Sequence, residues 1–206
     1  MKKEIIILKY LFITFILFIS SSVIASVEWS EWKEIKFSQV PLKIDISINN
    51  EIGDTSFQAW RMNGNFNGKK AFLIWLENNS NIGKLIIEYT KYPPGWAISG
   101  SENDRKYLIS NTARMLGLEK KNNPLKNLKK NEIERYRDMK NNVVPFTFFE
   151  NKGNTCVIFN KGFYKVDDGF RDSALDDETI SAVFCKNSGT ISKSSLHILI
   201  DAIQRE

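Results

Sequence analysis

The sequence predicts an α+β fold, in which an antiparallel sheet carries helices on one side and a single disulfide joins two strands. Three observations support this prediction. Apolar and polar residues alternate in several short segments separated by turn residues. Two longer segments show helical spacing between capping signals. The only two cysteines, Cys156 and Cys185, both lie in β-branched or aromatic runs.

Residues 1–25 have the three features of a cleavable signal peptide. Lysines supply a basic start, residues 10–19 form an unbroken apolar and aromatic run, and small residues lead to Ala25. We expect cleavage after Ala25, which places the mature protein in the periplasm or outside the cell without a stable membrane span. The alternative is a retained anchor, but Lys9 and three serines interrupt the roughly 20 apolar residues that a spanning helix needs.

The mature chain has the size and charge of an ordinary exported domain. Removal of 25 residues from 206 leaves 181, enough for one domain over residues 26–206, with two lobes divided near Asn122 as the alternative. The formal net charge of +5 falls to +3, because the leader holds three lysines and one glutamate. This modest excess does not indicate a nucleic-acid-binding protein. Abundant lysine, asparagine and isoleucine are typical of an AT-rich bacterial genome.

The first half of the mature chain predicts an antiparallel meander. Leu42, Ile44, Ile46 and Ile48 point to one side of a half-buried strand, and the residues between them point to the other. Further strands are expected over residues 56–62, 70–77 and 84–91, because Asn-Gly pairs and an Asn-rich stretch separate them. A helix then follows from its cap Ser101 to Gly117, with one side packed on the sheet.

Residues 119–140 have eight basic and four acidic side chains, and their local charge of +4 exceeds the net charge of the mature chain. Asn123-Pro124, and Asn131 with Glu134, predict two short helices that form a solvated connector. The alternative is a partner-binding surface that makes weak contacts with anionic envelope surfaces. The basic residues of this candidate surface are Lys126, Lys129, Lys130, Arg135 and Arg137.

The last third returns to strands, expected over residues 146–150, 155–159 and 179–186, before a final helix capped by Ser192. Because exported cysteines are usually oxidised, Cys156 and Cys185 are expected to form a disulfide between neighbouring strands. The alternative is a free catalytic thiol, which would need a base. The only histidine, His197, is expected to form an exposed surface pair with Asp201 one turn further along the helix.

No catalytic residue, metal ion or cofactor is predicted. The chain lacks the H-E-x-x-H zinc motif, the G-x-S-x-G elbow, the P-loop and the G-x-G-x-x-G turn. One acidic cluster is expected to be a solvated loop, with calcium binding or acid-base chemistry as alternatives. Its members are Asp167, Asp168, Asp172, Asp176, Asp177 and Glu178.

All five tryptophans lie in the first half of the mature chain. Trp60 and Trp75 fall within expected strands, whereas Trp29, Trp32 and Trp96 lie near strand-poor ends and are candidates for a binding face.

The leading hypothesis for function is a non-catalytic binding or accessory protein of the bacterial cell envelope, with an unknown protein or ligand as its partner. The alternative is a carboxylate-dependent hydrolase that acts on cell-wall glycan or peptide, with carboxyl groups of the acidic loop as acid and base. A third hypothesis is an assembly component or secreted effector that docks through the basic residues of 119–140.

Overall fold

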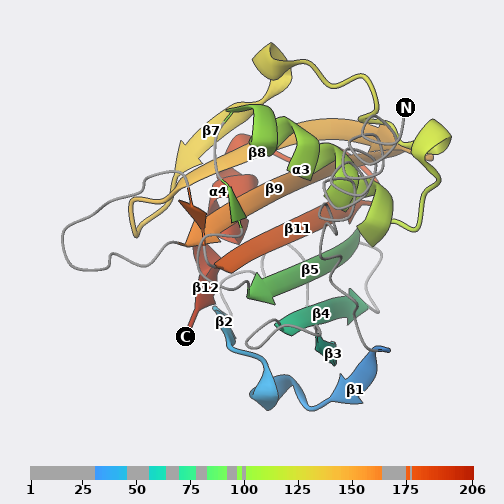
Figure 1. The fold of residues 1–206 in the computed structure, drawn as a ribbon. Helices are drawn as coiled ribbons and strands as arrows, with labels where there is room; N and C mark the ends of the chain where they lie inside the picture. The colour runs from blue at the N-terminus through green and yellow to red at the C-terminus, as the bar shows by residue number, and fades with distance from the viewer. Residues whose placement is uncertain are drawn as a thin grey trace, which may run out of the picture.

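The computed structural model describes residues 31–45, 56–63, 70–77, 83–91, 97–98, 101–163, 175–176 and 178–206. Within these residues, eight strands form one antiparallel sheet (Figure 1). From one edge to the other they are β1 (Lys33–Ile35), β3 (Ser56–Asn63), β4 (Lys70–Glu77), β5 (Gly83–Lys91), β11 (Glu178–Lys186), β9 (Asn154–Phe163), β8 (Val143–Asn151) and β7 (Glu134–Arg137). Because β5 pairs with β11 at the centre, strands from both halves of the chain build the same sheet.

Shorter elements surround this sheet. Two further sheets have two strands each: β10 (Leu175–Asp176) pairs with β6 (Ala97–Ile98), and β12 (Ile203–Arg205) pairs with β2 (Leu42–Ile44). The described α-helices are α3 (Ser101–Met115) and α4 (Lys193–Ala202). Single 3₁₀ turns are η1 (Phe37–Gln39), η3 (Lys120–Asn122) and η4 (Lys130–Glu132).

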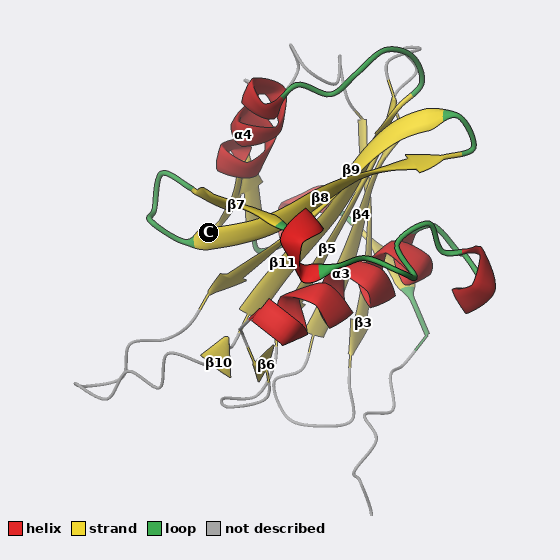
Figure 2. Ribbon diagram, turned by 90° about the horizontal axis from the view of Figure 1, so that it is seen from above, coloured by secondary structure: helices red, strands yellow, loops and turns green. Residues whose placement is uncertain are grey.

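The two faces of the large sheet carry separate apolar clusters. On β11, Ile180, Ala182 and Phe184 join the cluster that contains the buried side of α4, whereas Val183 and Cys185 join the cluster beneath α3. The two helices therefore lie on opposite sides of the sheet (Figure 2).

This arrangement corrects the expectation that the helices pack on one side. Residues of β11 from 180 to 185 are all buried, so both faces of this central strand need an apolar cover. One helix cannot cover both faces, and the chain therefore places α3 on one side and α4 on the other.

Most strands and both described helices lie where the sequence predicts them. The strands expected over 56–62, 70–77 and 84–91 are β3, β4 and β5, which pair in that order. At the end of α3, Gly117 adopts a φ of +63° and the amide of Leu118 donates to the carbonyl of Ala113, which closes the helix. At the start of α4, the hydroxyl of Ser192 accepts from the amide of Ser195 at 3.0 Å.

The prediction of two helices within 119–140 is wrong. This segment forms turns, the short η3 and η4, and the edge strand β7. Its apolar residues Leu125, Leu128 and Ile133 are buried in the cluster beneath α3, and Tyr136 pairs across the ladder with Val144. Contacts with the sheet and α3 therefore override the local capping signals.

The predicted disulfide is confirmed. Cys156 of β9 and Cys185 of β11 are direct cross-strand partners, and their sulfur atoms lie 2.10 Å apart. Neither cysteine is free. The bond lies on the face of the sheet that α3 covers, within the same buried cluster as Leu108.

Candidate functional site

A groove of about 560 Å³ runs along the outer edge of β8. We call it the β8 groove. One wall is the turn segment that follows α3, and the other is the second half of β8, beyond the reach of β7. Its lining residues are Pro124, Leu125, Asn127, Leu128, Glu132, Glu134, Thr147, Phe148, Phe149 and Glu150.

Polar contacts to α3 hold the turn wall of the β8 groove in place. The side-chain amide of Asn123 donates to the carbonyl of Ile109 at 2.7 Å. The guanidinium of Arg105 donates to the carbonyl of Leu128 at 3.4 Å. Because Leu125 and Leu128 are also buried, this wall is anchored by both apolar and polar contacts.

The β8 groove begins where the pairing of β7 with β8 stops. Glu134, the first residue of β7, lies opposite Phe146, and the ladder runs from there to the pair Arg137 and Val143. Just beyond this point, the hydroxyl of Thr147 donates to the carbonyl of Glu132 at 3.0 Å, where the chain leaves the sheet. Among the described residues, β8 has no outer strand partner from residue 147 to 151.

The hairpin between β8 and β9 fixes which backbone groups face the groove. Its two-residue loop, Lys152-Gly153, has φ values of +52° and +80°, as a type I′ turn requires. In such a hairpin the flanking residues Asn151 and Asn154 exchange hydrogen bonds, and alternate residues then point inward and outward. The amide and carbonyl groups of Phe148 and Glu150 are therefore directed away from β9, into the groove.

The charge of the β8 groove is negative. Three of its lining residues are glutamates, and none is lysine or arginine. Glu134 forms an ion pair with Lys193 of α4, and Glu132 accepts from the backbone amide of Lys129 at 2.7 Å. Glu150 accepts from the hydroxyl of Thr155 at 3.2 Å. Glu132 and Glu150 have no cationic partner within the described part of the chain.

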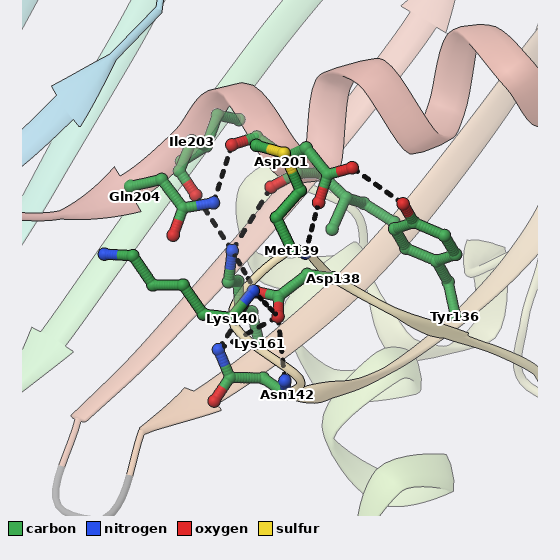
Figure 3. Close-up of polar contacts among 10 residues, drawn as sticks. Tyr136, Asp138, Met139, Lys140, Asn142, Lys161, Asp201, Ile203 and Gln204 are labelled. Carbon is green, nitrogen blue, oxygen red and sulfur yellow. Dashed lines mark hydrogen bonds and ion pairs between the residues drawn. The ribbon is translucent and has the colours of Figure 1, made fainter.

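A buried ion pair lies on the face of the sheet that α4 covers, between β9 and the turn that joins β7 to β8 (Figure 3). The Lys161 ammonium is 2.6 Å from the Asp138 carboxylate, and both side chains are fully buried. Lys161 also donates to the carbonyls of Ile200 and Ile203 at 3.3 and 3.2 Å. With three acceptors for three donors, this ammonium joins β9, the hairpin and the end of α4.

The Asp138 carboxylate is held by a ring of donors. It accepts from the backbone amides of Lys140 and Asn142 and from the side-chain amide of Asn142. Burial alone would raise the pKa of Asp138, but the hydrogen bonds from Asn142 and Lys161 outweigh it and hold the pKa below its usual value. The carboxylate is therefore charged and fully engaged, which fits a structural role.

His197 and Asp201 do not form the exposed pair that the sequence predicts. His197 stacks on the ring of Tyr136 with centroids 3.8 Å apart, and Asp201 accepts from the Tyr136 hydroxyl at 2.7 Å. Asp201 also accepts from the backbone amide of Met139 at 3.0 Å. The hydrogen bond to Asp201, with some burial, raises the pKa of Tyr136 to about 12. His197 and Asp201 of α4 therefore hold β7 beside the helix, because both contact Tyr136 of that strand.

A row of buried polar side chains crosses three strands beneath α3. Ser181 of β11 donates to Asn160 of β9 and accepts from Asn111 of α3, each at 2.7 Å. On β5, beside Ser181, Glu88 forms an ion pair with Arg114 of α3 at 2.9 Å. Burial raises the pKa of Glu88, and Arg114 offsets only part of that effect. This row fixes the position of α3 on the sheet.

The residues expected to form a binding surface lie at two separate places. Trp32 is 39% exposed and precedes β1, at one edge of the sheet. The five basic residues lie at or near the opposite edge, which β7 forms. Arg135 pairs with Asp104 of α3 at 2.9 Å, and Lys126, Lys129 and Lys130 are exposed beside the β8 groove. Trp29 and Trp96 lie outside the described residues.

The predicted acidic cluster is mostly outside the described residues, which include only Asp176 and Glu178 of its six members. Glu178 is buried, and its carboxylate forms ion pairs with the guanidinium of Arg205 of β12 at 3.0 Å and with the ammonium of Lys91 of β5 at 3.3 Å. Burial would raise the pKa of Glu178, but hydrogen bonds from Arg205 and Tyr89 hold it below its usual value. No group of three or more potential ligands for a metal ion occurs in the part of the chain that the structure describes.

Sequence reasoning missed the β8 groove, although one signal was present. The segment Asn151-Lys152-Gly153-Asn154 is a hairpin signal that fixes the pairing of β8 with β9. The glutamates at 132, 134 and 150 gave no motif, because they meet only when β7 stops short of the end of β8.

Within the described ranges, neither helix has the length and apolar character needed to cross a membrane. Comparison with known proteins finds no matching family model, no matching curated protein and no matching solved structure.

Proposed function

We propose that this chain is an exported protein of the bacterial envelope that binds a partner through the β8 groove and performs no chemistry itself. The observation that supports binding is the outward-facing backbone of β8, which borders a groove with an anchored wall. The disulfide supports export, because such bonds persist in oxidising compartments. Under this proposal residues 1–25 are removed and the body over residues 26–206 acts in the periplasm or outside the cell.

Comparative capture from envelope extracts tests the binding role. The mature protein is immobilised beside two variants, Glu150→Arg in the β8 groove and Glu34→Arg on β1 at the opposite edge of the sheet. We expect a partner that the wild type and Glu34→Arg retain and that Glu150→Arg loses. A partner retained equally by all three proteins would refute binding at the groove.

Two further measurements test export and the absence of chemistry. The N-terminal sequence of the native protein is expected to begin at Ser26, and a chain that still begins at Met1 would refute cleavage. A glycan and peptide hydrolysis screen is expected to show no turnover. Turnover that is lost when Glu132 or Glu150 is changed to glutamine would refute the absence of chemistry and assign a hydrolase activity to the groove rather than to the acidic loop.

A further inference from the structure

We propose that the β8 groove takes an extended basic peptide, which pairs with the free edge of β8 as an additional strand. This inference rests on the proposed function and names the chemical class of its partner. It depends on three properties of the groove: the direction of its backbone groups, the length of the free edge, and the sign of its charge.

The backbone of β8 offers an incoming strand the same groups that β7 uses. Phe146 and Val144 face β7 and lie opposite Glu134 and Tyr136. Phe148 and Glu150 continue that outward-facing series by the alternation of the ladder. By this alternation the amide of Phe148 and both backbone groups of Glu150 do not bond to β9, and outside the strand ladders the described chain gives them no other backbone partner. The Phe148 carbonyl has only a long contact of 3.5 Å from the Thr147 hydroxyl.

The free edge is long enough for a short strand. Residues 147 to 151 of β8 have no outer neighbour among the described strands. At about 3.4 Å per residue, this stretch spans about 17 Å and accommodates four or five residues of an extended peptide. A peptide in this position would extend the line of β7, because β7 begins opposite Phe146. Strand addition of this kind draws affinity from main-chain hydrogen bonds and specificity from alternate side chains.

The lining of the groove selects the charge of the peptide. Glu132 and Glu150 are exposed and have no described cationic partner, so both carboxylates remain available to a lysine or arginine of the ligand. Phe148 is half-buried and offers an apolar contact to a neighbouring side chain. Because Phe148 and Glu150 are two positions apart on β8, their side chains point to the same face, and we expect an apolar and a basic residue two positions apart in the ligand.

The nearby lysines do not reverse this charge. Lys126, Lys129 and Lys130 are exposed, but none is among the lining residues of the groove. The ammonium of Lys126 donates to the carbonyl of Lys121 at 2.9 Å, on the turn itself. An acidic ligand would therefore have to bind outside the groove, and the experiment separates that outcome from the proposed one.

Selection from a random library of ten-residue peptides tests the inference on the mature, oxidised protein. We expect the selected peptides to be rich in lysine or arginine, and their affinity to fall as salt increases. On binding, the amides of Phe148 and Glu150 should become protected from hydrogen exchange. Selection of acidic peptides, or the absence of any selected peptide, would overturn the inference.

Backbone methylation of the best selected peptide tests strand pairing directly. A methyl group on an amide that faces β8 should weaken binding at least about tenfold, because one hydrogen bond is lost and its acceptor is left without a partner. Methylation of the next amide along, which faces away, should change the affinity by less than about threefold. Equal effects at both positions would overturn strand pairing.

Two substitutions at one residue separate the backbone from the charge. Glu150→Gln keeps the outward amide and should weaken binding about two- to fivefold, as the loss of one exposed ion pair does. Glu150→Pro also removes the amide, whose outward direction makes proline tolerable on an edge strand, and should weaken binding at least about tenfold. Glu34→Gln, an exposed carboxylate on β1, is the matched control and should bind normally.

The two proposals fail in different ways. If Glu150→Arg loses a partner from envelope extracts while no basic peptide binds the wild type, the groove binds another class of ligand and only this inference is wrong. If basic peptides bind at the groove but no envelope partner depends on it, the proposed function is wrong. The peptide measurements remain interpretable should Glu150→Pro fail to fold, because methylation and hydrogen exchange use the unmodified protein.

Discussion

Substitution of Lys161 by methionine should destabilise this protein strongly. Methionine keeps the length and apolar stem of lysine but removes the ammonium, which is fully buried and contacts Asp138, Ile200 and Ile203. The change leaves a buried carboxylate without its counter-charge and two carbonyls without their donor. Removal of one partner of a buried ion pair costs about 3 to 5 kcal/mol, a large fraction of the total of about 5 to 15 kcal/mol for an ordinary domain.

Urea unfolding at pH 7 with the disulfide intact measures this loss. We expect the midpoint to fall while the slope with denaturant stays constant, so that the change reports stability alone. Lys193→Met is the matched control, because Lys193 and Glu134 form an ion pair whose side chains are 61% and 44% exposed. Loss of that pair should cost at most about 1 kcal/mol.

A double-mutant cycle shows whether the loss arises from the pair itself. When Asp138→Asn is combined with Lys161→Met, no unpaired charge remains buried. The double variant should therefore be more stable than the sum of the two single changes by at least about 1 kcal/mol. A loss below about 1 kcal/mol for Lys161→Met, or strict additivity in the cycle, would refute the argument that this pair holds the hairpin to α4.

Three further predictions concern stability. Replacement of Cys156 and Cys185 by serine opens a covalent loop with a sequence separation of 29 and should lower the free energy of unfolding by about 3 to 4 kcal/mol. Urea unfolding measures this loss, and an unchanged free energy of unfolding would refute the prediction. Ser192→Ala removes the cap of α4 and should cost about 1 kcal/mol in the same assay, whereas Ser194→Ala, inside the helix, should cost less. The raised pKa of Glu88 means that the folded state binds the proton of this carboxyl group more tightly than the unfolded state does. The group therefore stabilises the fold below the pKa of the unfolded state, 4.5, and this contribution is lost as the pH rises through the pKa of the folded state. Glu88→Gln should therefore equal or exceed the wild type in stability at pH 7 and lose that advantage by pH 4; a Gln variant with the same deficit at both pH values would contradict this sign.

Local patterns in the sequence were sufficient for most elements of the fold. The turn residues between them located β3, β4 and β5, and capping signals located both ends of α3 and the start of α4. Within 119–140 the same kind of signal failed. Asn131 and Glu134 resemble a capping arrangement, yet Glu134 begins β7, because pairing with β8 and burial of Ile133 stabilise a strand there.

The candidate site could not be predicted, because its parts are brought together only by long-range contacts. Glu150 and Glu132 are 18 positions apart and share no motif; they line one groove only because β7 is shorter than β8. Lys161 likewise belongs to β9 and Asp138 to the turn between β7 and β8, and their pairing depends on where α4 ends.

The sequence by itself determined which residues alternate, where the described helices are capped, and that Cys156 and Cys185 join neighbouring strands. These features follow from interactions between residues a few positions apart, or from the chemistry of a single pair. Only the tertiary structure decided that α3 and α4 cover opposite faces of the sheet and that half of β8 has no outer neighbour among the described strands. Those outcomes depend on the order of strands across the sheet, which a local period of 2 or 3.6 residues does not encode.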